Sequence, residues 1–150
     1  MKIIKKGVSI MKYLIIMLLI FSSYLNAKDI AFVKSVKGEV SIQNGSLSIS
    51  VKQGDKLTES MIVQSKKNSS VVLIFNDESI VSLGENTVLV LKTYLFEPKN
   101  NKFAFRLDLN KGTAAFESGK IGKLSPESFI FKTPESTVAI RGTKFVVKVQ

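Results

Sequence analysis

The chain has 150 residues, contains neither cysteine nor histidine, and carries a formal net charge of +10. The missing residue types exclude disulfide bonds, thiolate metal sites and a histidine general base. The basic residues are mainly scattered lysines rather than a stripe of Lys and Arg with stacking aromatics, so the composition argues against nucleic-acid binding.

The first 27 residues have the three parts of a secretory signal peptide. An unbroken apolar run covers residues 13–21 and is followed by small and polar residues up to Ala27; the basic head before it contains Lys2, Lys5, Lys6 and Lys12. The apolar run is shorter than the roughly 20 residues that a bilayer-spanning helix needs. We therefore predict cleavage between Ala27 and Lys28, with either Met1 or Met11 as the start of the chain.

Removal of this leader takes away four lysines and leaves 18 basic and 12 acidic residues, a net charge of +6. Residues 28–150 have the size of one compact domain, whose core we expect to span residues 31–149. The predicted location is the bacterial periplasm. A retained leader would instead anchor the protein in the inner membrane, which is the one membrane contact we expect.

The first half of this domain shows the period-two alternation of half-buried strands. We expect strands over residues 36–42 and 47–51, the second ending at Gly54. Residues 71–75 are continuously apolar and predict a strand that is buried on both faces. Short polar residues at 76–79 and 84–86 predict turns, which flank a strand at 80–83 and precede another at 88–91.

The second half continues in the same way, and residues 103–109 show the cleanest alternation. We expect a loop at 97–102, a turn at 110–112 and strands over residues 114–116, 129–131, 138–140 and 145–149. Pro134 stops strand pairing after the second of these segments. No window shows a helical period, so the prediction is a single all-β domain, folded as a roll, a sandwich or a solenoid.

Residues that could perform catalysis are scarce. Asp77 and Glu78 are the only adjacent acidic pair, and residues 76–79 are better explained as a turn than as a glycosidase pair or a calcium loop. No Ser-x-x-Lys motif stands beside an apolar helix, and no glycine-rich segment could hold a phosphate. We therefore predict a protein that is not an enzyme and that has no cofactor and no metal site.

Five motifs, in order along the chain, resemble those of the FecR domain family. They are residues 36–40 (VKGEV), 54–57 (GDKL), 73–79 (LIFNDES), 83–91 (LGENTVLVL) and 133–147 (TPESTVAIRGTKFVV). The resemblance implies an extracytoplasmic β-rich domain, known from regulators that receive a signal from an outer-membrane transporter and pass it to a sigma factor. Glu78 stands where the family usually has glycine, which puts the tight form of that turn in question.

The same resemblance defines what this chain is expected to lack. Only residues 1–12 precede the apolar run, so we expect no cytoplasmic anti-sigma domain, and nothing after Gln150 provides a C-terminal signalling module. The chain is therefore expected to be a stand-alone exported FecR-like domain protein.

Within the last motif, Arg141, Gly142 and Thr143 form the candidate site, and two interpretations of it remain open. They could contact a partner. Alternatively, Gly142 forms a β-bulge while Arg141 either pairs with a carboxylate such as Asp77 or Asp108 or caps free backbone carbonyls.

Three functional hypotheses follow from the sequence. The first is a periplasmic binding or signalling module that engages an envelope protein or polymer, with residues 145–149 as a candidate edge strand for backbone pairing. The second is a structural or assembly protein of the envelope that forms homo-oligomers. The third is a glycan-acting enzyme that uses two carboxylates.

Overall fold

The computed structural model describes residues 27–139 and 144–150, and nearly all regular structure in them is β. The strands are β1 (Ala31–Lys37), β2 (Val40–Asn44), β3 (Leu47–Ser50), β4 (Lys56–Leu57), β5 (Ile62–Ser65), β6 (Ser70–Phe75), β7 (Ile80–Leu83), β8 (Val88–Glu97), β9 (Lys102–Glu117), β10 (Phe129–Lys132), β11 (Thr137–Ala139) and β12 (Lys144–Val149). The helical segments are η1 (Pro98–Asn100), α2 (Lys120–Leu124) and η2 (Pro126–Ser128). The all-β prediction is confirmed.

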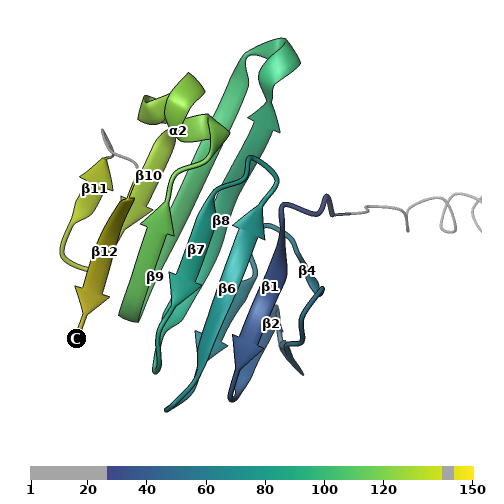
Figure 1. Cartoon of the computed structure of the whole chain (residues 1–150), viewed down its shortest axis with the longest axis vertical. Coiled ribbons are helices and arrows are strands. Elements are labelled where there is room, and N and C mark those ends of the chain that lie inside the picture. Colours follow the sequence, from purple (N-terminus) through teal and green to yellow (C-terminus); the bar gives the residue numbers. More distant parts are fainter. Residues whose placement is uncertain (1–26, 140–143) are drawn as a thin grey trace, which may run out of the picture.

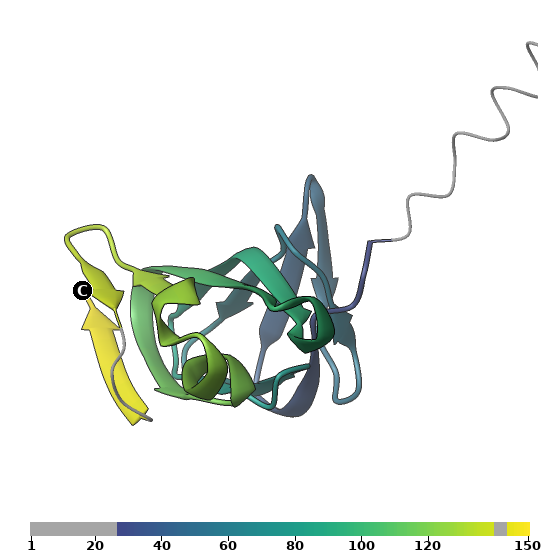
Figure 2. The ribbon, with the colours of Figure 1, turned by 90° about the horizontal axis from the view of Figure 1, so that it is seen from above.

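The strands form one sheet that curls into a half-barrel (Figures 1 and 2). The order along the sheet is β3-β2-β5-β8-β9-β7-β6-β1-β4, while β12 and the β10–β11 pair attach to β9. Every pairing is antiparallel except that of β9 with β10. Of the expected architectures, the roll is therefore the one that forms, because a solenoid would stack parallel strands.

Strand β9 belongs to both halves of the curled sheet. Its first part pairs with β8 and β10, and its last part pairs with β7 and β12. Between the two parts the register with β8 shifts, because Val88 lies opposite Lys111 while Leu89 lies opposite Leu109. The expected turn at residues 110–112 is wrong: the segment is a β-bulge, which bends one continuous strand.

The interior of the half-barrel is filled by alternate side chains of both halves. Phe105 of β9 lies at its centre, with ring centroids 4.5–5.8 Å from those of four other aromatic side chains, Phe75, Tyr94, Phe116 and Phe129. Phe105 and its neighbours on the same face, Leu107 and Leu109, are completely buried. The clean alternation of residues 103–109 is thus explained by one face that packs into this core.

The expected strand over residues 36–42 is wrong as well. Gly38 has a φ of +74°, and together with Glu39 it separates β1 from β2. The Glu39 N–H donates a hydrogen bond to Ser69 Oγ at 2.8 Å, which fixes the break. The two strands consequently join different parts of the sheet, since β1 pairs with β6 and β2 pairs with β5.

Helix α2 was not predicted from the sequence. This helix has five residues, fewer than two turns, so an amphipathic repeat cannot be recognised in it. Its buried side chain is Ile121, and the helix itself lies at one end of the half-barrel beside β9 and β10 (Figure 1). In the part of the chain that the structure describes, no helix has both the length and the apolar character needed to cross a bilayer.

Candidate functional site

The candidate motif Arg141–Gly142–Thr143 lies outside the described residues, between β11 and β12. Both carboxylates that were considered as partners for Arg141 have other partners. Asp108 lies 3.3 Å from Arg106 Nε, and Asp77 is completely buried among hydrogen-bond donors.

Asp77 holds together three segments that are distant in sequence. Its carboxylate accepts hydrogen bonds from Ser79 Oγ at 2.7 Å, from the Ile121 N–H at 3.1 Å and from the Tyr94 hydroxyl at 3.1 Å. Its carbonyl accepts a further bond from the Lys120 N–H at 2.7 Å. A buried carboxylate is tolerated when donors surround it in this way, so Asp77 is structural rather than catalytic.

Tyr94 completes this arrangement from strand β8. Its hydroxyl accepts a hydrogen bond from the Asp77 N–H at 2.7 Å while donating to the Asp77 carboxylate. Burial, and then the neighbouring Asp77 charge, raise the pKa of Tyr94 well above its ordinary value. The Tyr94 hydroxyl therefore stays protonated and acts as a fixed donor.

The turn that precedes Ser79 forms despite the unusual residue at position 78. Glu78 has a φ of +70°, the region that favours glycine, and its N–H donates to the Phe75 carbonyl at 2.9 Å. Its side chain forms an ion pair with Lys120. The tight turn is therefore kept, and the doubt raised by the missing glycine was unfounded.

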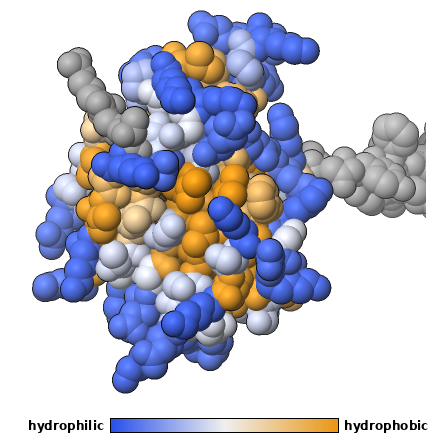
Figure 3. Space-filling model, in the orientation of Figure 1, coloured by the Kyte–Doolittle hydropathy of each residue, from blue (hydrophilic) through white to orange (hydrophobic). Residues whose placement is uncertain are grey.

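The strongest candidate surface is an apolar patch on the outer face of the sheet, which we call the outer-face patch. It crosses β1, β6, β7, β9 and β12, and its members are Phe32, Val72, Ile74, Ile80, Ala115 and Val146. Phe32 is 42% exposed and Val146 is 69% exposed, while the other four are half-buried. Figure 3 shows apolar surface across the middle of this face, with hydrophilic side chains around it.

Strand register brings these side chains together from distant parts of the sequence. Phe32 lies opposite Ile74, and Ile74 lies opposite Ile80, so three strands contribute one row. Val72 begins a second row, which continues through Ser82 and Ala115 to Val146. A shallow depression of about 310 Å³ lies where β7, β9 and β12 meet in this region.

The outer-face patch explains a wrong expectation about residues 71–75. Strand β6 buries Val71, Leu73 and Phe75, whereas Val72 and Ile74 are only half-buried on the opposite face. The prediction of burial on both faces from this continuous apolar run is therefore wrong. In an antiparallel sheet with one solvent-facing side, the same run indicates an apolar outer surface.

Lysines dominate the charge on the strands that carry the patch. Lys34, Lys37 and Lys148 are exposed, and no carboxylate of the described residues lies within 4 Å of their ammonium groups. Lys144 is paired with Glu117 at 3.0 Å. The patch is therefore an apolar surface with a positive border.

Strand β12 occupies the edge position that was expected for residues 145–149. Among the described strands it pairs with β9 alone. Phe145 faces inward, where its ring packs against Phe116 and Phe131, and Val146 faces outward into the patch. The edge of β12 that faces away from β9 has no strand partner among the described residues. Val146 belongs to the outer-face patch, and Lys144 and Lys148 lie along the same strand.

A cavity of about 460 Å³ near the start of the domain contains two carboxylates, Asp29 and Glu59. Both already have partners within the fold. Asp29 forms an ion pair with Lys56 at 2.7 Å and raises the pKa of that lysine, and Glu59 accepts a hydrogen bond from the Tyr94 N–H. The cavity thus contains two carboxylates, as the glycosidase hypothesis requires, but each of them already contacts another residue of the fold.

The described residues also lack a group of side chains that could bind a metal ion. Across residues 27–139 and 144–150, no three acidic side chains approach one another closely enough to hold a metal ion.

Comparison with family models gives a match to FecR, described as FecR protein, over residues 61–150. The chain belongs to the FecR family. The matched residues run from just before β5 to the end of β12 and include all of the outer-face patch except Phe32. Searches among curated proteins and among solved structures returned no match.

FecR-family proteins are non-enzymatic regulatory and signalling proteins, typically extracytoplasmic or associated with a membrane. Membership therefore places this chain in a family of regulatory and signalling proteins. Of the five motifs in the sequence, the first two lie before the matched residues, and the last three lie within them.

Proposed function

We propose that this FecR-family protein is an exported signalling module that binds another protein of the cell envelope through the outer-face patch. The observation that carries the proposal is the combination of Phe32 and Val146, both large and exposed, with four half-buried apolar side chains on one face. Apolar patches that remain exposed in a folded domain commonly mark protein interfaces. The predicted leader supports a periplasmic location for this contact.

The surface also indicates the chemistry of the partner. An apolar centre would cover the patch, and an acidic border would meet Lys34, Lys37 and Lys148. A purely anionic polymer would fit the lysines but would leave Phe32 and Val146 in water. The patch therefore favours a protein partner over a polysaccharide.

The test is site-specific photo-crosslinking in intact cells, with the photoreactive residue placed at position 82 in the middle of the outer face. We expect crosslinks to a reproducible envelope protein, and we expect Val146→Glu to reduce them at least tenfold, since it places a charge in the apolar contact. Leu124→Glu is the matched control because Leu124 is also a large apolar side chain, 57% exposed, but belongs to α2. Both variants should keep the wild-type melting temperature.

Two results would contradict the proposal. One is the recovery of no reproducible protein from position 82 in cells that export the domain. The other is an equal loss of crosslinking in Val146→Glu and Leu124→Glu, which would show that the outer-face patch has no special role. Fractionation of the same cells tests the periplasmic location directly.

A further inference from the structure

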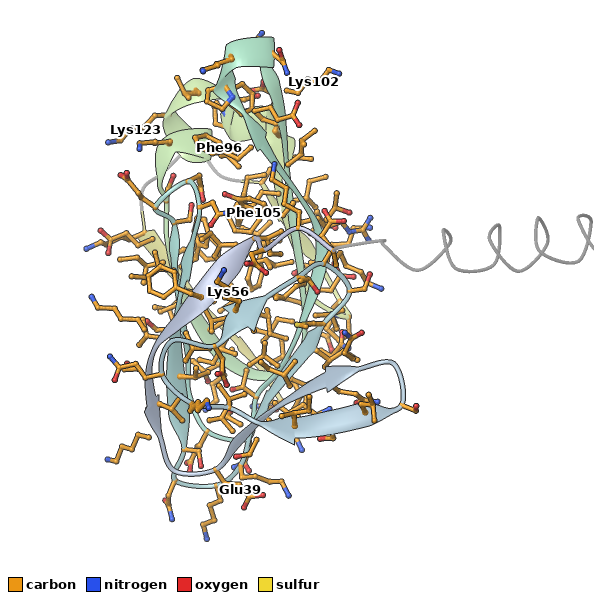
Figure 4. All side chains as sticks on the ribbon, turned by 90° about the vertical axis from the view of Figure 1, so that its right-hand side faces the viewer. Glu39, Lys56, Phe96, Lys102, Phe105 and Lys123 are labelled. Atoms are coloured by element: carbon orange, nitrogen blue, oxygen red, sulfur yellow. The ribbon has the colours of Figure 1, made fainter. Side chains whose placement is uncertain are left out.

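Strand β3 forms an edge of the sheet that is unlike the other edges. It pairs with β2 on one side and with no other described strand. All four of its residues are exposed, and its two large apolar side chains, Leu47 and Ile49, are 67% and 61% exposed. The β2–β3 hairpin stands out from the half-barrel (Figures 2 and 4).

Ile49 is the last member of a row of core side chains. The row runs across the sheet from β9 to β3 through directly opposed residues, in the order Leu109, Leu89, Val63, Ile42 and Ile49. The first three are completely buried and Ile42 is 8% exposed, whereas Ile49 lies largely in solvent. The apolar row thus continues beyond the region that the domain itself can cover.

The charge pattern sets β3 apart as well. Residues 43–51 contain no charged side chain, in a chain of which 23% is charged. The other long edge, β12, carries Lys144 and Lys148, the two-residue β4 carries Lys56, and β11 has three residues. Lysines and short length protect sheet edges against pairing with another chain, and β3 has neither protection.

The sequence of β3 is complementary to itself. If two copies run antiparallel about a twofold axis at Ser48, each Leu47 lies opposite the partner's Ile49 and the two Ser48 residues face each other. Ser46 then lies opposite the partner's Ser50. Because alternate residues share a face, all four apolar side chains gather on one side and the serines on the other.

We propose that two copies of this chain pair through their β3 strands, antiparallel about Ser48, and so join two curled sheets into one. The added strand supplies backbone hydrogen bonds to an open edge, and the partner's Leu47 extends the core row beyond Ile49. This contact is separate from the outer-face patch, which stays free for an envelope partner.

The experiment uses the protein purified from the envelope of cells that export it, with its mass measured by size-exclusion chromatography and light scattering. Wild-type protein should have the mass of two chains. Ser48→Lys and Ser48→Glu should each be monomeric, because the substituted charge faces its own copy across the axis. An equimolar mixture of the two variants should recover the dimer, since opposite charges then meet.

A cysteine variant tests the register, because the natural chain has no cysteine. Ser48→Cys should form a covalent dimer under mild oxidation, since the two residues at this position are directly opposed. Ser46→Cys should not, because it faces position 50 of the partner. Equal oxidation of both variants would overturn the pairing about Ser48.

The proposal is overturned by a wild-type protein that stays monomeric at the highest soluble concentration. It is equally overturned if Ser48→Lys stays dimeric, or if mixing Ser48→Lys with Ser48→Glu leaves both monomeric while each keeps the wild-type melting temperature. Val146→Glu should remain dimeric, and Ser48→Lys should keep its crosslinks from position 82. Failure of the β3 contact can therefore be distinguished from failure of the outer-face patch.

Discussion

The buried carboxylate of Asp77 connects the turn before β7 to strand β8 and to helix α2 through hydrogen bonds. Its donors come from Ser79, Tyr94 and Ile121, so one side chain links the turn to β8 and to α2. Removal of such a group would leave several buried donors without acceptors, which is more costly than the loss of one exposed hydrogen bond. The acidic pair at 77 and 78 is therefore divided between a buried structural role and an exposed ion pair with Lys120.

Tyr94 gives the first prediction at this scale, which concerns alkaline pH. Burial raises the pKa of Tyr94 above its unfolded value of about 10. The neutral hydroxyl is the form that the fold stabilises, so this contribution is complete below about pH 10 and is lost as the pH rises further. We expect tyrosinate absorbance to appear only together with loss of the β-sheet circular dichroism signal.

The measurement can be assigned to one residue because the chain has three tyrosines, of which Tyr13 and Tyr24 belong to the predicted leader. In the processed protein the absorbance therefore reports Tyr94 alone. Tyr94→Phe serves as the control and should show no tyrosinate band. A band with a midpoint near pH 10 while the sheet stays intact would contradict the buried, Asp77-bonded position of this residue.

The sequence predicted the turn at residues 76–79 but not the burial of Asp77. The turn depends on local residue types, which a sequence displays directly. The burial depends on Tyr94 and Ile121, which lie 17 and 44 residues away. Glu78 is a second example. It occupies a position where the family usually has glycine, and its ion-pair partner Lys120 is also distant in sequence.

At the scale of elements, β9 decides the shape of the fold, and Gly112 allows it to bend. Gly112 has a φ of +88°, and a Cβ there would lie 2.5 Å from Thr87 Cα. The Thr87 hydroxyl accepts a hydrogen bond from the Thr113 N–H at 3.0 Å, so this neighbour cannot move away freely. Both the backbone conformation and the lack of space require glycine at this bend.

A pair of alanine substitutions separates these two requirements. Gly54 has a φ of +90°, but open space surrounds its Cβ position. Gly54→Ala should lower the free energy of unfolding by about 1–2 kcal/mol, the cost of a left-handed alanine. Gly112→Ala should lower it by roughly 1–3 kcal/mol more because of the collision with Thr87.

Urea unfolding followed by circular dichroism measures both effects. Equal losses in the two variants would show that strain alone matters and that the bend at Gly112 is not tightly packed against Thr87. A smaller loss in Gly112→Ala than in Gly54→Ala would contradict the position of β9 against the segment before β8.

Strand positions were largely predictable, whereas strand ends were not. Short apolar runs bounded by polar turn residues identified the segments that became β6, β7, β10 and β12, and one face of each packs into the core. The residues at 110–112 have the composition of a turn, yet pairing with β7 and β12 on either side keeps β9 continuous. Such pairing is decided by distant strands, so local composition could not reveal it.

At the scale of the whole molecule, the start of the fold bears on how the leader is removed. Asp29 is the first residue with several contacts, since its side chain pairs with Lys56 and its carbonyl accepts a bond from Asn76 Nδ2 at 2.7 Å. The Ile30 N–H then donates to the Leu57 carbonyl at 2.8 Å. A cut between Ala27 and Lys28 would leave every one of these contacts intact.

We therefore expect the exported protein to begin at Lys28, which N-terminal sequencing or intact mass will show. Replacing Ala27 by a bulky residue such as Phe should slow processing, because signal cleavage requires a small residue at that position. A mature N-terminus beyond Ile30 would contradict the boundary, since it would remove the ion pair of Asp29 with Lys56.

The curl of the sheet could not be read from the sequence, although its all-β composition could. A roll, a sandwich and a solenoid share the same alternating strands and polar turns. They differ in which strands are neighbours, and that depends on register between segments as distant as β1 and β6. The RGT motif stood out in the sequence, whereas the outer-face patch depends on assembling five strands and was not anticipated.

The sharing of β9 between both halves makes the domain one cooperative unit. Strand β9 pairs with β8 and β10 in one half and with β7 and β12 in the other. Unfolding of either half would therefore remove backbone hydrogen bonds of a strand that the other half needs. We therefore expect the two halves to unfold together in a single transition, since the loss of one half removes pairing partners of β9 on which the other half depends.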